Sequence, residues 1–172
     1  YELNLTGATA TTATPIVNGG VLNVSGAGQF TATAGNVTVQ YGGVLSVNDT
    51  GTALTRFGGT TRTLTLATGA FDYTANGASP SAETFASIAS TWGANRLTLN
   101  NAGAANATLT FAGGAFAVGG GSVLNLVSQQ TFNATTNRVV SPPTILRRAR
   151  WWWSPNHRRR CRPSSRRGVR YR

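Results

Sequence analysis

The sequence is poor in the groups that usually carry chemistry. Its 172 residues include one cysteine, one histidine and four acidic residues, with no lysine and no methionine. A single cysteine, Cys161, excludes a disulfide within the chain. No run of 18 apolar residues occurs, so the sequence predicts no membrane-spanning helix. Tyr1–Leu5 has neither the basic nor the apolar segment of a secretory signal, and a start inside the repeat predicts a piece of a longer protein.

The few titratable residues are scattered. Asp49 and Asp72 are separated by about one coil of the repeat described below, so stacked carboxylates for calcium or for pectate-lyase-like chemistry are one interpretation. Calcium takes six to eight oxygen ligands, more than two aspartates provide. The two aspartates also hold different places in the repeated phrase. Both points favour the interpretation that they are solvated residues, in a turn and on an outer strand face, rather than a shared site. His157 and Cys161 lie among arginines without a nearby acid, unlike a metal site or a catalytic triad. We therefore expect no catalytic residue, no metal and no cofactor.

What the chain does contain is a repeated phrase. A small or turn residue precedes two large apolar residues that are separated by one position, which is the alternation of a strand with one buried face. The copies are Gly20–Val24, Gly43–Val47, Gly69–Tyr73 and Gly114–Val118, with a looser copy at Ser122–Leu126. A second phrase runs shortly ahead of three copies, at Val37–Val39, Leu64–Leu66 and Leu109–Phe111.

The spacing of the copies predicts the fold. Their central residues Leu22, Leu45, Phe71 and Phe116 are separated by 23, 26 and 45 positions, and the last value is close to two periods. A period of this size suits one coil of a parallel β-helix and is shorter than a WD40 blade of about 40 residues. We expect an all-β fold, a parallel β-helix (β-solenoid) with coils of roughly 23 residues, over residues 1–140.

Two stretches leave alternatives open. Phe30–Thr33 is a candidate third side of the coil. Residues 75–94 interrupt the rhythm, first with the loop Ala75–Pro80. Phe85 and Ile88, three positions apart, are compatible with a short helix or equally with a strand. Trp92 is interpreted as a packing residue at a loop, with a ligand platform as the less favoured alternative.

The charge is confined to the end of the chain. Residues 1–146 contain four acids and four arginines, whereas residues 147–172 contain 11 arginines and no acid, so the whole net charge of +11 lies in that last segment. Arginine neutralises phosphates, and tryptophan stacks on bases or lies at the headgroup level of anionic membranes. The segment 141–172 is thus predicted to be a disordered tail that binds nucleic acid or anionic lipid. The candidate polyanion-binding residues are Arg147, Arg148, Arg150, Trp151, Trp152, Trp153, Arg158, Arg159 and Arg160.

The favoured hypothesis is that this tail arises from a frameshift in the coding sequence. The composition changes within a short stretch from Gly, Thr and Ala to Arg, Trp, Pro and Ser, while the repeat stops. A GC-rich coding sequence read in the wrong frame has this composition, because many such codons encode arginine. A frameshift near residues 138–147 and a genuine binding tail both remain open, and a new read of the coding DNA distinguishes them.

The repeat resembles a known class of bacterial sequence. The matching stretches are Gly19–Val24, Gly42–Val47, Arg62–Leu66, Glu83–Phe85, Asn95–Leu99 and Ala107–Phe111. Over roughly residues 16–127 these resemble the autotransporter-associated β-strand repeats of large bacterial surface and secreted proteins. The resemblance implies an exported parallel β-helix passenger at the outer-membrane surface or outside the cell, with a structural or adhesin-like and non-catalytic role. It also implies host, matrix or neighbouring cell-surface components as partners.

Overall fold

The chain folds as a stack of parallel strands. The computed structural model describes residues 1–7, 14–31, 35–57, 59–101, 103–132 and 137–141, and the predicted tail lies outside these residues from position 142 onward. The strands in these residues are β1 (Glu2–Leu5), β2 (Ile16–Asn18), β3 (Val21–Val24), β4 (Val37–Gln40), β5 (Val44–Asn48), β6 (Thr63–Ala67), β7 (Ala70–Thr74), β8 (Ser81–Asn100), β9 (Ala107–Val118), β10 (Ser122–Ser128) and β11 (Asn137–Val140).

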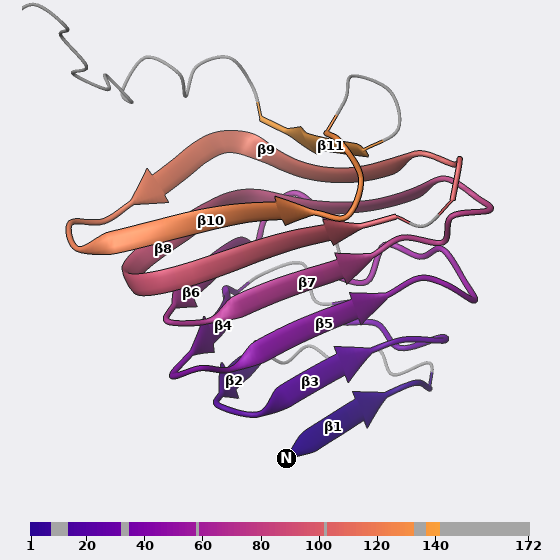
Figure 1. The fold of residues 1–172 in the computed structure, drawn as a ribbon. Coiled ribbons are helices and arrows are strands. Elements are labelled where there is room, and N and C mark those ends of the chain that lie inside the picture. Colours follow the sequence, from indigo (N-terminus) through magenta and orange to yellow (C-terminus); the bar gives the residue numbers. More distant parts are fainter. Residues whose placement is uncertain (8–13, 32–34, 58, 102, 133–136, 142–172) are drawn as a thin grey trace, which may run out of the picture.

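The strands form two parallel sheets. In the first sheet, β1, β3, β5, β7, the C-terminal part of β8 and β10 follow one another, each paired in parallel with the next. In the second sheet the order is β2, β4, β6, the N-terminal part of β8, β9 and β11. Figure 1 shows the first sheet in front and β2, β4 and β6 behind it. Each turn of chain contributes one strand to each sheet, so the predicted parallel β-solenoid is confirmed.

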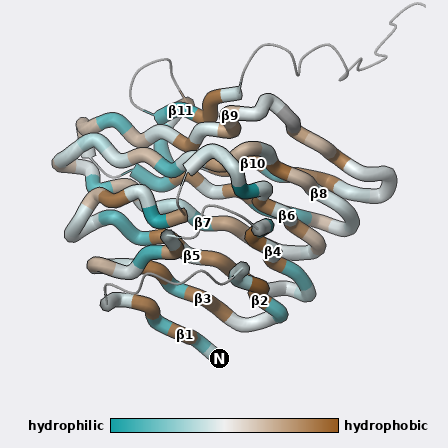
Figure 2. Tube along the Cα trace, turned by 180° about the vertical axis from the view of Figure 1, so that it is seen from behind, coloured by the Kyte–Doolittle hydropathy of each residue, from teal (hydrophilic) through white to brown (hydrophobic). Residues whose placement is uncertain are grey.

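Equivalent apolar residues stack in columns inside the solenoid. The register places Leu22 beside Leu45, Leu45 beside Phe71, and Phe71 beside Leu97. Leu45, Phe71 and Leu97 are fully buried, and the apolar segments recur at the same place in successive turns (Figure 2). Removing each such side chain from water contributes about 1.5–3 kcal/mol. The alternating pattern therefore specifies which face of each strand is buried.

Glycines make the corners between the two sheets, as the sequence predicts. Gly20 has a φ of 69°, in the left-handed region that costs other residues energy. A Cβ atom there would lie 2.7 Å from the carbonyl oxygen of Tyr1 in the preceding turn. The corner thus requires glycine for both its dihedral angle and its close approach.

One predicted copy of the phrase belongs to the other sheet. Phe116 does not continue the column of Phe71 but pairs with Ile88 in the second sheet, and Leu97 takes the position after Phe71. Likewise, Leu109 pairs with Glu83 rather than continuing the column of Leu64. These two assignments were wrong because an alternating apolar pair looks the same on any side of the coil.

The later turns are also longer than the spacing of the first copies indicates. Successive members of the column at Leu22, Leu45, Phe71 and Leu97 lie 23, 26 and 26 positions apart, so the later turns exceed the first by three positions. In β10 it is Leu126, not Leu124, that pairs with Leu97. A shift by two positions leaves the same side chains facing inward, because the strand period is two.

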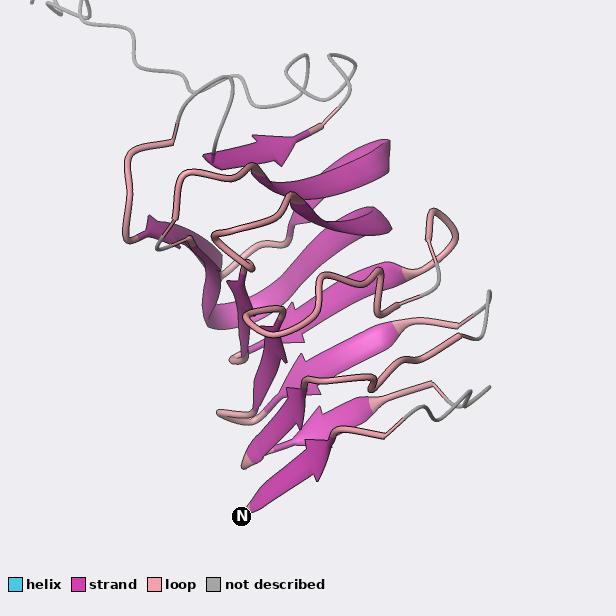
Figure 3. Cartoon of the chain, turned by 90° about the vertical axis from the view of Figure 1, so that its right-hand side faces the viewer, coloured by secondary structure: helices cyan, strands magenta, loops and turns pink. Residues whose placement is uncertain are grey.

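The third side differs between turns. In the early turns it consists of loops, drawn in pink along one side of the stack in Figure 3. In the later turns the strands extend onto it: Ser81–Phe85 of β8 pairs with Ala107–Phe111 of β9. Residues 83–88 therefore form a strand, not a helix. Four phenylalanines stack along this side, with ring centroids 5.4–6.2 Å apart, namely Phe30, Phe57, Phe85 and Phe111.

Candidate functional site

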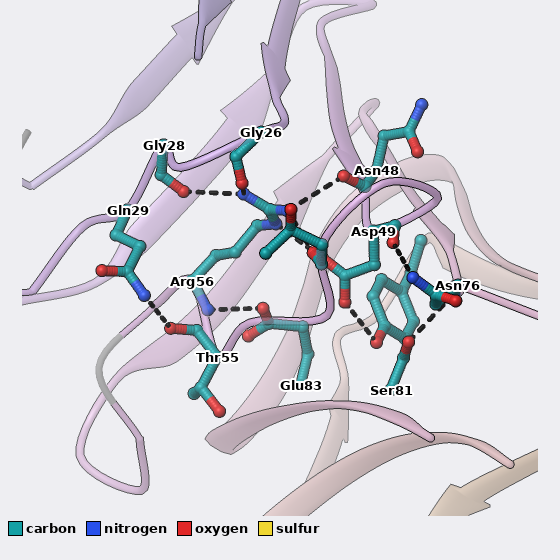
Figure 4. Close-up of polar contacts among 12 residues, drawn as sticks. Gly26, Gly28, Gln29, Asn48, Asp49, Thr55, Arg56, Asn76, Ser81 and Glu83 are labelled. Carbon is teal, nitrogen blue, oxygen red and sulfur yellow. Dashed lines mark hydrogen bonds and ion pairs between the residues drawn. The ribbon is translucent and has the colours of Figure 1, made fainter. Parts of the chain in front are cut away.

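A buried arginine organises the loops of the third side. The Arg56 guanidinium and the Asp49 carboxylate are both fully buried, with Arg56 Nε 2.6 Å from Asp49 Oδ1. Arg56 Nη1 donates to the carbonyl oxygens of Gly28, at 2.8 Å, and Gly26, at 3.1 Å. Nη2 donates to those of Asn48 and Thr52, each at 3.0 Å. Figure 4 shows the guanidinium surrounded by these oxygens.

The loop geometry explains why an arginine lies here. Carbonyl groups of a buried loop lack the ladder partners that a strand would supply, and leaving them unpaired is costly. Arginine has five N–H donors in a planar fork, so one side chain can satisfy several carbonyls and a carboxylate. The acceptors of Arg56 come from the loop after β3 and from the end of β5 and the loop after it. Arg56 thus joins two successive turns by its side chain.

Glu83 extends the cluster into the next turn. The Arg56 backbone N–H donates to Glu83 Oε1 at 2.6 Å, so a side chain acts as the acceptor where a neighbouring strand would offer a carbonyl. Burial raises the pKa of the Glu83 carboxyl to about 8, and the hydrogen bond from Arg56 opposes this shift only in part. Within the described residues, Glu83 Oε2 is buried without a hydrogen-bond partner. A neutral carboxyl at pH 7 is consistent with these surroundings.

Asp49 is held from two sides. Tyr73 donates its hydroxyl to Asp49 Oδ2 at 2.9 Å, opposite the contact with Arg56. Burial raises the pKa of Asp49, while Arg56 and Tyr73 act in the opposite direction. Burial also raises the pKa of Tyr73, with Asp49 adding to the shift. The cluster therefore combines one arginine, one paired carboxylate, a neutral phenol and a second carboxyl that favours its protonated form.

This cluster has the chemistry of a structural clamp. The Arg56, Asp49 and Glu83 side chains are all fully buried, so a solute has no direct access to them. Asp49 is consequently not the solvated turn residue that the sequence suggested. The sequence-based interpretation also missed Arg56 and Glu83 as a pair. One sequence feature could have revealed this pair: Phe30, Phe57 and Phe85 recur at nearly equal spacing and stack in one column, and Arg56 and Glu83 lie just before two of them.

The outer faces carry ladders of polar side chains. On the first sheet, Asn23 Nδ2 donates to Asn4 Oδ1 at 2.9 Å. On the same sheet, Asp72 forms an ion pair with the half-exposed Arg96, at 2.9 Å. Asp72 thus points outward as a face residue, as expected, and does not share a site with Asp49. Asn4 and Asn23 occupy equivalent positions of adjacent turns, whereas Asp72 and Arg96 pair diagonally between turns, and both contacts lie on a polar outer face.

An exposed aromatic pair interrupts this polar surface at a corner between the sheets. The rings of Tyr41 and Trp92 meet edge to face, with centroids 5.7 Å apart. Tyr41 is 64% exposed and Trp92 is 44% exposed. Trp92 lies within strand β8 rather than in a loop, and its ring is not part of the core.

The two ends of the stack form shallow apolar depressions. One is lined by the first turn, including Leu3, Ile16 and Leu22. The other lies at the opposite end and includes Leu126, Phe132 and Val139. Both depressions are formed by apolar side chains of the terminal turns, on which no further described turn is stacked.

The remaining predicted site residues fall outside the described residues. These are Arg147, Arg148, Arg150, Trp151, Trp152, Trp153, Arg158, Arg159 and Arg160, together with His157 and Cys161. Within the described ranges, no three His, Cys, Asp or Glu side chains come together as a metal site. The same residues contain no helix with the length and apolarity needed to cross a membrane.

Comparison with known proteins gives no family. No protein-family model matches the chain, and no curated protein or solved structure is significantly similar to it.

Proposed function

We propose that this chain is a non-catalytic, rigid solenoid segment of a bacterial surface or secreted protein, with a structural or adhesin-like role. The observation that carries the proposal is the division of its polar groups. The buried ones, such as Arg56 and Asp49, bond to one another and to backbone carbonyls. The exposed ones form ladders such as Asn4 with Asn23.

This division favours presentation over catalysis. A catalytic site needs titratable groups that reach a substrate, and the buried carboxyls of Asp49 and Glu83 have no such access. The stacked turns, in contrast, place polar side chains such as Asn23, Ser46 and Asp72 in register at the strand spacing of about 4.8 Å, which suits contact with an extended surface. Host, matrix or neighbouring cell-surface components are the partners we propose for these faces.

Protease treatment of intact cells tests the proposed location. With antibodies against the purified chain, we expect the signal on intact source cells to disappear after treatment with an external protease. A cytoplasmic protein in the same cells serves as the control and stays intact. A signal that persists until the cells are permeabilised would contradict an extracellular role.

A second candidate function rests on the charge of the segment 147–172. Because residues 1–146 have no net charge, we propose that any salt-dependent binding of nucleic acid or anionic lipid belongs to this segment. Changing Arg147, Arg148, Arg150 and Arg158–Arg160 to serine in the full chain removes six of the 11 arginines of this segment, so the chain should elute from heparin at a lower salt concentration. Unchanged retention would exclude these arginines as the binding residues.

A further inference from the structure

Tyr41 and Trp92 stand apart from the other exposed apolar side chains. The other large ones occupy the two ends of the stack, at Tyr1, Leu3 and Ile16 and at Val118, Val123, Leu126 and Phe132. Tyr41 and Trp92 instead lie midway along it, where turns are already stacked on both sides. The exposure of Tyr41 and Trp92 is therefore not a consequence of lying at an end of the stack.

The ladder places a small residue between the two rings. Gln40 pairs with Ala67, and Ala67 pairs with Trp92, so Ala67 separates the turns that carry the aromatic residues. Ala67 faces outward by the strand alternation, yet it is only 4% exposed. Its small side chain leaves room for the rings to meet above it. The two rings thus meet edge to face across the intervening turn.

Tyr41 occupies a backbone position that disfavours it. Its φ is 54°, and that of Thr68 in the adjacent turn is 58°, whereas Gly19 and Gly93 serve the corresponding corners in neighbouring turns. Residues other than glycine at positive φ are uncommon, and such strain often accompanies function. The Tyr41 N–H donates to the Ala67 carbonyl at 3.1 Å, which helps to hold the strained corner. An exposed tyrosine at a glycine position indicates a role outside the core.

The surface beside the pair is polar and uncharged. The outward side chains of β2, β4, β6 and Ser87–Trp92 in the described residues include no acid and no base. Gln40 Nε2 donates to Asn18 Oδ1 at 2.7 Å, and the hydroxyls of Thr63 and Ser87 are 2.8 Å apart. The nearby charges, Asp72 and Arg96, lie on the first sheet and neutralise each other. This surface offers amides, hydroxyls and two aromatic rings.

We propose that Tyr41 and Trp92 form a binding platform for a neutral polysaccharide. The C–H faces of a sugar ring pack on aromatic rings, and its hydroxyls bond to amides and hydroxyls such as those of Gln40 and Thr65. Tyrosine and tryptophan suit such a ligand, because each combines a large apolar ring with a polar group. An anionic ligand would find no cation on this face. A protein partner would need about 800 Å² of complementary surface, and among the described residues between Val37 and Trp92 the exposed large apolar side chains are those of Tyr41 and Trp92 alone.

Titration calorimetry of the full chain with uncharged polysaccharides tests the proposal. Galactomannan, xyloglucan, dextran and mixed-linkage β-glucan are the probes, and we expect at least one of them to bind. Trp92→Ala should weaken that binding at least tenfold, and Trp92→Phe should weaken it less. Phe132→Ala is the control, because Phe132 is 40% exposed but lies at the end of the stack.

Tyr41→Gly separates binding from folding. Glycine tolerates the φ of 54° without strain, so this variant should melt at or above the temperature of the unaltered chain. We nevertheless expect its polysaccharide binding to fall at least tenfold. The proposal is overturned if none of the four polysaccharides binds, or if Tyr41→Gly and Trp92→Ala bind as tightly as the unaltered chain. Neither result bears on the cellular location, which the protease experiment measures separately.

Discussion

The two-sheet side and the looped third side of the early turns are stabilised in different ways. In the sheets, backbone groups pair with the next strand, and columns such as Leu45, Phe71 and Leu97 fill the interior. On the third side, the loops after β3 and β5 have no ladder, and Arg56 donates to their carbonyls instead. From Ser81 onward, strands extend onto the third side, and backbone pairing replaces the arginine clamp.

The difference shows what a solenoid turn requires. Backbone polar groups need partners in every turn, whether or not the segment is a strand. Where the strands provide them, small and apolar side chains are sufficient. Where they do not, a buried charged side chain takes over, at a desolvation cost that its many hydrogen bonds must offset. The third side of the early turns should therefore be more sensitive to single polar substitutions than the outer faces of the sheets.

The largest expected effect comes from breaking the apolar column. Leu45→Asp places a carboxylate at a fully buried position, and we expect loss of the cooperative thermal transition in circular dichroism. Ser46→Asp, at the next position and on the outer face, is the matched variant. It stands beside Asp72, so its cost should be about 1 kcal/mol or less. Similar melting temperatures for the two variants would contradict the inward and outward assignment.

The next effect comes from removing the clamp. Arg56→Met leaves Asp49 buried without its cation and several carbonyls without donors, so we expect a loss of about 3–5 kcal/mol in the free energy of unfolding. Chemical denaturation measures this loss.

Arg96→Met is the control for that prediction. Arg96 also pairs with an aspartate, but it is half exposed, and such pairs contribute about 0–1 kcal/mol. If Arg56→Met and Arg96→Met lower the free energy of unfolding equally, the third side would not be more sensitive to polar substitutions than the outer face of the first sheet.

The remaining effect is graded rather than abrupt, because it follows the titration of Glu83 with pH. The pKa of Glu83 is about 8 in the fold against 4.5 in the unfolded chain, so between these values the folded state binds the extra proton. The contribution of Glu83 to the free energy of unfolding therefore falls as pH rises from about 4.5 to 8, by roughly 1 kcal/mol per pH unit. Glu83→Gln keeps the acceptor for the Arg56 N–H and removes the titration. Its melting temperature should vary less over this range, and an unaltered slope would argue against a buried, protonated Glu83.

Much of the fold could be predicted from local patterns. The alternation in Val21–Val24 and Val44–Asn48 specified strands, their buried faces and their glycine corners. The assignment of Phe116 failed because the same alternation serves both sheets, and only pairing with Ile88 distinguishes them. The clamp was not predicted either, since Arg56 and Glu83 lie in different turns and no local pattern connects them.

The sequence by itself determined that the chain forms stacked parallel strands, because period-two alternation and glycine corners act over short stretches of neighbouring residues. Only the tertiary structure decided which strand joined which sheet, how Arg56 met Asp49 and Glu83, and that Tyr41 and Trp92 share one surface. The physical reason is that these contacts depend on the length of each intervening turn. Because the turn from Leu22 to Leu45 is shorter than the turn from Leu45 to Phe71, equal sequence spacing does not identify the side chains that meet.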